Sequence, residues 1–544
     1  MSLTCRSFSG PATATLWRKL YNVKPLLRVL PPDIFVDQQE FVSVIKQVHN
    51  GHILTYGQAL ARIVQPADLE RFKHYARFVQ DLGTSWLPDE TCLAALQLCF
   101  PAPLLPKLRH LSWVPGPSSL SFITMFLHPG ITTLRLYMAG APEAGRLLAS
   151  SLVPRLPTLC PSIQVFEFHG HDDFAPVFTL FYSPSDATSR WNELRVLDLP
   201  YLHGSDIQCI ASCSRLASLR IRGLPEDFPK CGMLIAQPAF VSLRTLELEP
   251  QAMHLATSFF ESLQLALRLE SLKVKCKEIK KACHWKALLL SIARTCDPDT
   301  LQRLTIKGYG KYTEDPEPDV PDWYLTALSF DVASHLLTFR NLTHLVLRSW
   351  GGFVFEDEHF DSLAQAFPDL QHLELLEEDE SHRHEASIYA LIPLARHCPR
   401  LHFLAMDFHA DDYTYEEHET RGVCQRALTW LDVRYSAITS ARVTAALLSA
   451  IFPRLACVSS EGYMPDREDM RGPDPDLVHT RRERKRKWAQ VDRMLPMLRF
   501  VRAQVERDVR LRSVEGSTEG VITDQETSNP PLHDEEYDTD YSDV

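Results

Sequence analysis

Glycine and long apolar runs are scarce in this sequence. Glycine supplies 21 of the 544 residues, which excludes collagen-like and glycine-rich disordered classes of protein. The longest largely apolar stretches, such as 287–293, are far shorter than the roughly 20 residues that a membrane-spanning helix needs. Residues 1–10 also lack the apolar core of a signal peptide. We therefore expect a chain without a membrane partner.

Motifs for catalysis and for metal binding are missing as well. The sequence contains no glycine-rich phosphate loop, no GxSxG turn, no HExxH and no CxxC pair. Its 13 cysteines are odd in number and scattered, which is typical of reduced thiols in the cytosol or nucleus. These absences favour a non-enzymatic protein of the cytoplasm, the nucleus or both, with no cofactor and no metal.

Basic residues are in the minority, with 57 Lys and Arg against 69 Asp and Glu and a formal net charge of −12. Net acidity argues against nucleic acid as a partner, because such binding needs a cationic surface that displaces counterions. The charge is also unevenly placed. Residues 481–512 carry 12 basic and 4 acidic side chains, whereas 513–544 carry 10 acidic and no basic ones. Residues 513–544 contain too few apolar side chains for burial to offset the entropy lost on ordering, so this composition predicts a disordered tail.

The preceding segment, 466–512, is predicted to be a basic helix. Pro496 is expected to kink or end this helix. The basic run 481–487 has two interpretations: a nuclear-localisation or phosphate-binding run, or a solvated helix start that pairs with the acidic tail. The helix prediction depends on apolar residues at helical spacing, namely Trp488, Val491, Met494 and Leu495.

Leucine, in contrast, is abundant, with 76 of the 544 residues. Much of it follows one pattern: an apolar residue, two residues, an apolar residue, one residue, and an apolar residue. Twelve copies and a degenerate thirteenth start about 29 residues apart on average, a spacing typical of leucine-rich repeats. The copies start at Leu108, Ile131, Ile163, Leu194, Leu216, Leu243, Leu269, Leu301, Leu342, Leu370, Leu401, Leu428 and Leu455.

The repeat predicts the fold. The fourth and sixth positions of each copy lie two residues apart and therefore share one face of a short strand. One unit cannot bury that face alone, but stacked units can. We expect an α/β leucine-rich-repeat solenoid, shaped like a horseshoe, over 101–465, preceded by a helical linker or cap over 31–100. A slot three residues before a copy holds either Cys or Phe, which indicates a buried corner and no thiol chemistry; it is occupied by Cys160, Cys213, Cys398, Phe367 and Phe452.

The residues between and after the two inward positions of each strand are expected to point to the concave face. In the middle copies many are basic, interrupted by Glu247 and Glu249. Toward the C-terminal end they become acidic, with Glu374, Asp407 and Asp432. A basic stripe would recruit an acidic or phosphorylated segment of a substrate protein; alternatively, the charges only keep the horseshoe soluble. The substrate-binding candidates are Arg220, Arg222, Lys273, Lys275, Lys307 and Arg348.

The N-terminus resembles the second half of an F-box. The stretch Leu3-Thr4-Cys5-Arg6-Ser7-Phe8, followed by Leu16-Trp17-Arg18-Lys19-Leu20, is similar to F-box proteins of mushroom-forming fungi, and so are the linker-like stretches 26–33 and 68–77. The repeats downstream agree with the leucine-rich-repeat organisation of that family. Because the Leu-Pro-x-Glu-Ile opening does not precede this half, we expect an N-terminally truncated F-box in 1–30.

The resemblance implies a function. F-box proteins dock the Skp-type adaptor and cullin of ubiquitin ligases, and their repeats bind the substrate protein that receives ubiquitin. The resemblance thus implies a non-catalytic recognition subunit. Two alternatives are open: the N-terminal residues simply cap the end of the solenoid, and the chain is a scaffold without a ubiquitin role. The adaptor-docking candidates are Leu3, Phe8, Leu16, Trp17 and Leu20.

Overall fold

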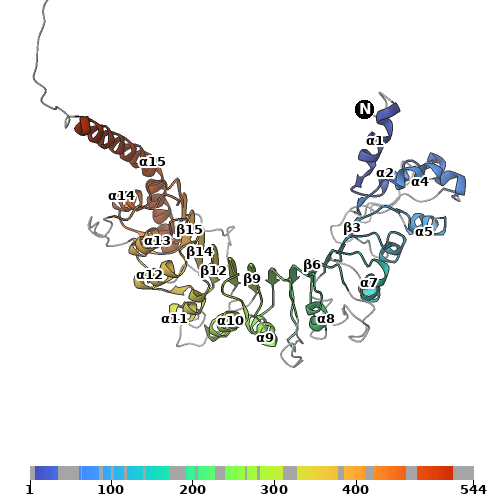
Figure 1. Ribbon diagram of the computed structural model, residues 1–544, viewed down its shortest axis with the longest axis horizontal. Coiled ribbons are helices and arrows are strands. Elements are labelled where there is room, and N and C mark those ends of the chain that lie inside the picture. The colour runs from blue at the N-terminus through green and yellow to red at the C-terminus, as the bar shows by residue number, and fades with distance from the viewer. Residues whose placement is uncertain are drawn as a thin grey trace, which may run out of the picture.

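A computed structural model of the chain has a mixed α/β fold dominated by one large parallel sheet (Figure 1). None of its described helices is both long enough and apolar enough to cross a membrane. The structure describes residues 6–34, 61–62, 64–84, 90–99, 103–114, 119–138, 143–170, 191–202, 206–226, 239–263, 266–277, 282–309, 327–377, 385–410, 422–460 and 475–518.

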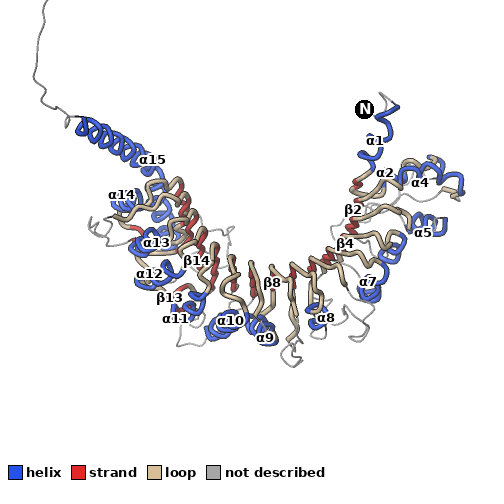
Figure 2. Tube along the Cα trace, in the orientation of Figure 1, coloured by secondary structure: helices blue, strands red, loops and turns tan. Residues whose placement is uncertain are grey.

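The large sheet has 15 parallel strands, and their spatial order follows the order of the chain. The sheet curves into an arc with the strands along the inner side and the helices along the outer side (Figures 1 and 2). Its strands are β1 (Lys19–Leu20), β2 (Asp81–Gly83), β3 (His110–Trp113), β4 (Thr133–Tyr137), β5 (Val165–His169), β6 (Val196–Leu199), β7 (Ser218–Ile221), β8 (Thr245–Leu248), β9 (Ser271–Cys276), β10 (Arg303–Gly308), β12 (His344–Ser349), β14 (His372–Glu377), β15 (Phe403–Met406), β17 (Trp430–Asp432) and β19 (Cys457–Ser459).

Two small parallel pairs join β11 (Leu328–Ser329) to β13 (Phe353–Val354) and β16 (His409–Ala410) to β18 (Ala437–Ile438). The α-helices of the described residues are α1 (Arg6–Trp17), α2 (Lys24–Leu27), α4 (Glu70–Ala76), α5 (Glu90–Cys99), α6 (Glu143–Leu152), α7 (Leu156–Leu159), α8 (Ile207–Ala211), α9 (Met253–Ser262), α10 (Ala282–Thr295), α11 (Phe330–Ala333), α12 (Asp357–Ala366), α13 (Leu391–His397), α14 (Ala441–Ile451) and α15 (Pro475–Thr518).

The strand register follows the leucine pattern. The fourth position of each copy pairs with the fourth position of the next, from Leu111 with Leu134 to Leu431 with Val458. These side chains are all buried, and they form one continuous core row between the sheet and the outer helices. The row consists of Leu111, Leu134, Phe166, Leu197, Leu219, Leu246, Leu272, Leu304, Leu345, Leu373, Leu404, Leu431 and Val458.

The sheet also extends beyond the range expected from the repeat. Strand β1 pairs with β2, and β2 pairs with β3, so the sheet crosses both boundaries expected at residues 30 and 100. Leu82 occupies the same inward row as Leu111, and Val79 is fully buried three residues before it. The sixth position of this unit is the polar Thr84, which is why a search for three apolar residues missed it.

The predicted C-terminal helix is present, and it extends further than predicted. Helix α15 continues through Pro496, so this proline does not end it, and it runs to Thr518, inside the segment predicted to be disordered. A proline removes one backbone hydrogen bond, but here side chains on both sides of it bind the sheet: Asp492 accepts from Val458 N at 2.8 Å, and Arg499 donates to Leu455 O. The remainder of the predicted tail, 519–544, lies outside the described residues.

The predicted buried corners are confirmed. Cys160, Cys213 and Cys398 are all buried, as are Phe367 and Phe452 in the equivalent slot. Burial raises the pKa of the Cys160 thiol to about 11 and that of Cys398 to about 12. A thiol held neutral in this way is a poor nucleophile, so these cysteines serve packing.

Candidate functional site

The inner, concave side of the arc is the open face of the sheet. No described helix lies there, whereas helices line the outer side (Figure 1). Because side chains alternate along a strand, the residues before, between and after the two buried positions of each copy point to this concave face. The strand register then decides which of these residues meet.

The middle of the concave face is an ion-pair lattice, and it contains four of the six predicted substrate-binding residues. Lys275 Nζ lies 2.7 Å from Glu249 and 2.9 Å from Glu247, and Lys273 lies 3.1 Å from Glu247. Arg220 donates to Glu249 Oε1 at 2.9 Å. The two glutamates that interrupt the basic stripe in sequence therefore neutralise it in space. We define the ion-pair lattice as Asp198, Arg220, Arg222, Glu247, Glu249, Lys273 and Lys275.

Arg222 lies at the N-terminal edge of the ion-pair lattice. Its guanidinium contacts Asp198 Oδ2 and His169 Nδ1, each at 2.7 Å, and His169 in turn stacks on Tyr137 at 4.5 Å between ring centroids. Burial raises the pKa of Asp198, while burial and the charge of Arg222 lower the pKa of His169. The histidine is therefore held neutral beside the arginine, and the partners of Arg222 come from within the sheet.

The last two predicted substrate-binding residues have different surroundings. Within the described part of the chain, Lys307 makes no ion pair, although it lies in register with Lys275 on one side and Arg348 on the other. Burial and the positive charges of Arg348, Lys273 and Lys275 lower the pKa of Lys307. The Arg348 guanidinium lies 5.7 Å from the centre of the Tyr309 ring. Lys307 therefore has cations on both neighbouring strands, and the nearby carboxylate of Glu374 opposes the lowering of its pKa only in part.

Beyond these cations, the concave face carries a row of stacked rings that sequence reasoning missed. His344, His372, Phe403 and Trp430 each precede the first buried position of their strand, and the register places them side by side. We call these four residues the aromatic ladder. Successive ring centroids are 5.6, 4.4 and 6.4 Å apart, with interplanar angles of 19°, 7° and 21°. Trp430, at the end of the ladder, is 45% exposed. The signal in the sequence was the recurrence of rings at one position of four successive copies.

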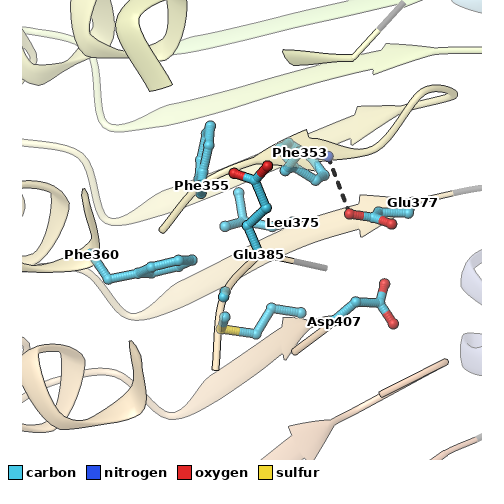
Figure 3. A pocket seen from close by; sticks show the side chains of 9 residues that line it. Phe353, Phe355, Phe360, Leu375, Glu377, Glu385 and Asp407 are labelled. Carbon is cyan, nitrogen blue, oxygen red and sulfur yellow. Dashed lines mark hydrogen bonds between the residues drawn. The ribbon is translucent and has the colours of Figure 1, made fainter. Parts of the chain in front are cut away.

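A small, shallow hollow lies where β14 and β15 end (Figure 3). Phe353, Phe355 and Phe360 line one side, and Glu377 and Asp407 lie on the other. Both carboxylates accept hydrogen bonds from the backbone. Glu377 Oε1 accepts a hydrogen bond from Phe353 N at 3.1 Å, and Asp407 Oδ1 accepts one from Tyr435 N at 2.7 Å. Among the described residues, no group of three or more His, Cys, Asp and Glu side chains is arranged to hold a metal ion.

At the N-terminal end of the sheet, the predicted adaptor-docking residues separate into two groups. Phe8 and Leu16 on α1 are 61% and 68% exposed. Trp17 instead stacks on Tyr75 at 4.3 Å, and Leu20 is buried in strand β1. Leu3 lies outside the described residues. The first two are available to a partner, whereas Trp17 and Leu20 hold the end of the fold together.

At the C-terminal end, the basic run 481–487 contributes to packing, which neither of its interpretations included. Arg484 donates to Tyr435 O at 2.8 Å, and Lys487 donates to Ile438 O at 3.3 Å. Trp488 Nε1 donates to Ser436 O at 2.8 Å, and the apolar residues expected at helical spacing pack on α14 and β19. Helix α15 therefore covers the last strand of the sheet, which would otherwise offer unpaired backbone groups.

Comparison of the chain with known proteins finds no matching family model and no matching curated protein.

Proposed function

We propose that the chain is a leucine-rich-repeat solenoid that acts as a non-catalytic substrate-recognition subunit of a cullin–RING ubiquitin ligase. The solenoid is supported by the in-register rows of buried residues and by a strand order that follows the chain. Stacked units of this kind present an extended concave surface, which is how such proteins bind other proteins. The chain would only position its target, and the ligase complex would transfer ubiquitin.

The observation that carries the proposal is the separation of two exposed surfaces on one sheet. Phe8 and Leu16 lie exposed on α1 at the N-terminal end (Figure 1). The aromatic ladder and Lys307, which forms no ion pair with the described residues, lie on the concave face far along the chain. A recognition subunit needs two such surfaces, one for the adaptor and one for the substrate. The resemblance of the N-terminal residues to an F-box assigns the first surface to a Skp-type adaptor.

The concave face supports recognition of an acidic or phosphorylated substrate segment at Lys307 and Arg348. Charge-assisted hydrogen bonds from lysine and arginine to carboxylate or phosphate are among the stronger polar contacts. The lattice cations Lys273 and Lys275 already bind glutamates, so an incoming anion would have to displace those contacts. Lys307 needs no such displacement, because no described carboxylate forms an ion pair with it.

The adaptor proposal is tested by recovery of a Skp-type adaptor and cullin with the full chain. We expect Phe8→Glu with Leu16→Glu to reduce recovery at least about tenfold, because the change places two charges in an apolar contact. Both residues are exposed, so the fold should survive. Leu98→Glu, at an 88% exposed leucine on α5, is the matched control and should leave recovery unchanged. Failure of the intact chain to bind the adaptor would refute the ligase role.

The second candidate function is a protein-interaction scaffold without a ubiquitin role. It is favoured by Trp17 and Leu20, because part of the F-box-like motif is used inside the fold, as a cap for the sheet would be. The same experiment separates the two candidates. A chain that binds protein partners through its concave face but never recovers the adaptor would be a scaffold.

A further inference from the structure

We propose that the Phe403–Trp430 end of the aromatic ladder docks an extended segment of a partner protein through a basic side chain of that segment. The inference rests on the proposed function as a recognition protein and adds the chemistry of the partner. It depends on the rings, on the charges in the next row of the face, and on the positions of the nearest cations.

The rings form a platform open to solvent. Phe403 and Trp430 lie directly opposite each other on β15 and β17, with ring centroids 6.4 Å apart and an interplanar angle of 21°. Trp430 is 45% exposed, and no described helix covers this side of the sheet (Figure 1). Tryptophan is the best ring partner for a guanidinium or ammonium group, and exposed rings also pack along the methylene stem of lysine or arginine.

The next row of the face has the charge that complements such a cation. Glu374, Ala405 and Asp432 lie in register on β14, β15 and β17. The two carboxylates are two strands apart, about 10 Å at the usual strand spacing, and the small, buried Ala405 lies between them. A basic side chain lying along Phe403 and Trp430 therefore reaches a position between two carboxylates.

Although burial raises the pKa of Glu374, the hydrogen bond from His372 and the charges of His372, Lys307 and Arg348 hold it below its ordinary value, so Asp432 is the carboxylate that an incoming cation stabilises more. Glu374 accepts from His372 Nε2 at 2.6 Å, and Asp432 Oδ1 accepts from the backbone N of Arg434 at 3.1 Å. The charge of Arg434 favours ionised Asp432, but burial and the like charge of Glu374 are stronger, and the pKa of Asp432 is raised. A cation between the two groups would relieve their repulsion.

The placement also orients the partner segment. The cations Lys307 and Arg348 lie on β10 and β12, on the other side of β14 from Asp432. Four strand spacings separate β10 from β17, about 19 Å, and Lys307 lies four residues, about 13 Å, beyond the position in register with Trp430. An extended segment of about seven residues, running obliquely, spans the resulting distance of about 23 Å. A segment lying across the strands would place an acidic group over Lys307 and a basic group over Trp430.

The test uses the full chain and fluorescent octapeptide pools that differ only at one fixed position, which is Arg, Lys, Ala or Glu. In fluorescence polarisation, the Arg and Lys pools should bind at least about fivefold more tightly than the Ala pool, and the Glu pool most weakly. Trp430→Ala and Asp432→Asn should each lower the ratio of Arg-pool to Ala-pool affinity about fivefold. Asp432→Asn keeps the side-chain oxygen that accepts from Arg434 N, so the turn is preserved.

Tyr137→Ala is the matched control, since it removes an exposed ring from the other half of the same face and should leave the ratio unchanged. Equal affinity for all pools, or a ratio that neither variant changes, would overturn this inference. The proposed function would survive that result, because two other measurements test it separately. One is recovery of the adaptor, and the other is the loss of affinity that Lys307→Ala causes for a peptide pool with phosphoserine at the fixed position. If no peptide pool bound at all, both this inference and the concave recognition surface would be wrong.

Discussion

The two halves of the concave face differ in how their cations are paired. From β6 to β9, each of the lattice cations contacts a carboxylate on the neighbouring strand or just after its end. From β10 to β17, Lys307 has only cations as close neighbours in its row, and rings stack to an exposed tryptophan. The cations of one half are therefore paired with carboxylates of the sheet, whereas Lys307 in the other half has no ion pair among the described residues. A count of charged residues on the face does not distinguish the two halves.

The largest expected effect is the loss of unfolding free energy when an inward residue of a strand is truncated, compared with truncation of the outward residue beside it. Leu431→Ala removes a fully buried leucine and should lower the free energy of unfolding by about 3 kcal/mol. Trp430→Ala, one residue earlier and 45% exposed, should cost less than about 1 kcal/mol. Urea unfolding of the two variants measures both values. Similar costs would mean that the ladder is part of the core and not a surface for a partner.

A smaller effect on the free energy of unfolding is expected from pH. The contributions of Glu249, in the half from β6 to β9, and of Asp432, in the half from β10 to β17, should change in opposite directions as the pH falls. Lys275 and Arg220 hold the pKa of Glu249 down, to about 2, although burial opposes them, so this residue stabilises the fold above its ordinary range near 4.5. That stabilisation is lost as the pH falls from about 4.5 toward 2, and Glu249→Gln should remove this part of the pH dependence. The pKa of Asp432 is raised, so its charge opposes folding above its ordinary range, and this penalty disappears as the pH falls.

Unfolding midpoints of the two variants across this pH range check the signs. Glu249→Gln should be less stable than the parent chain at pH 7 and equal to it at pH 2. Asp432→Asn should be equal or slightly more stable at pH 7. The contrast between the halves would be refuted if both variants lost stability in parallel.

The smallest expected effect compares two lysines that lie in register. Lys275 contacts Glu247 and Glu249, so Lys275→Met should cost about 1 kcal/mol of unfolding free energy. Lys307→Met removes a charge that has cations around it, so its cost should be near zero and stability could rise slightly. Thermal unfolding of the pair at low and high salt is the measurement, because screening should narrow the difference. A larger cost at Lys307 would show that this lysine has a structural partner.

Much of the fold could be predicted from the leucine spacing. The pattern located the strands β3 to β19 of the large sheet and their buried rows, and it identified Cys160 and Cys398 as buried corners. It missed β2, because Thr84 breaks the apolar triplet there. The helix that contains Pro496 was predicted, but its position on the sheet was not, because the bonds that hold α15 there connect residues more than 30 positions apart.

The candidate site was less predictable, and the reason is the distance in sequence between residues that meet. Arg220 and Glu249 lie 29 residues apart, and His344 and His372 lie 28 apart. Their copies are separated by stretches of unequal length, so a list of outward residues does not reveal which of them touch. Only the strand register brings these pairs together.

The sequence alone determined which residues face inward, because burial of apolar side chains with a period of two is a local property of each strand. It also determined that the copies must stack, since one unit cannot bury its own apolar face. The tertiary structure decided the function of the outward residues. Ion pairs and ring stacks depend on a few ångströms between neighbouring strands, and that spacing exists only after the copies have assembled. A charge stripe in the sequence thereby became a lattice of ion pairs, and four scattered rings became a stacked row on the concave face.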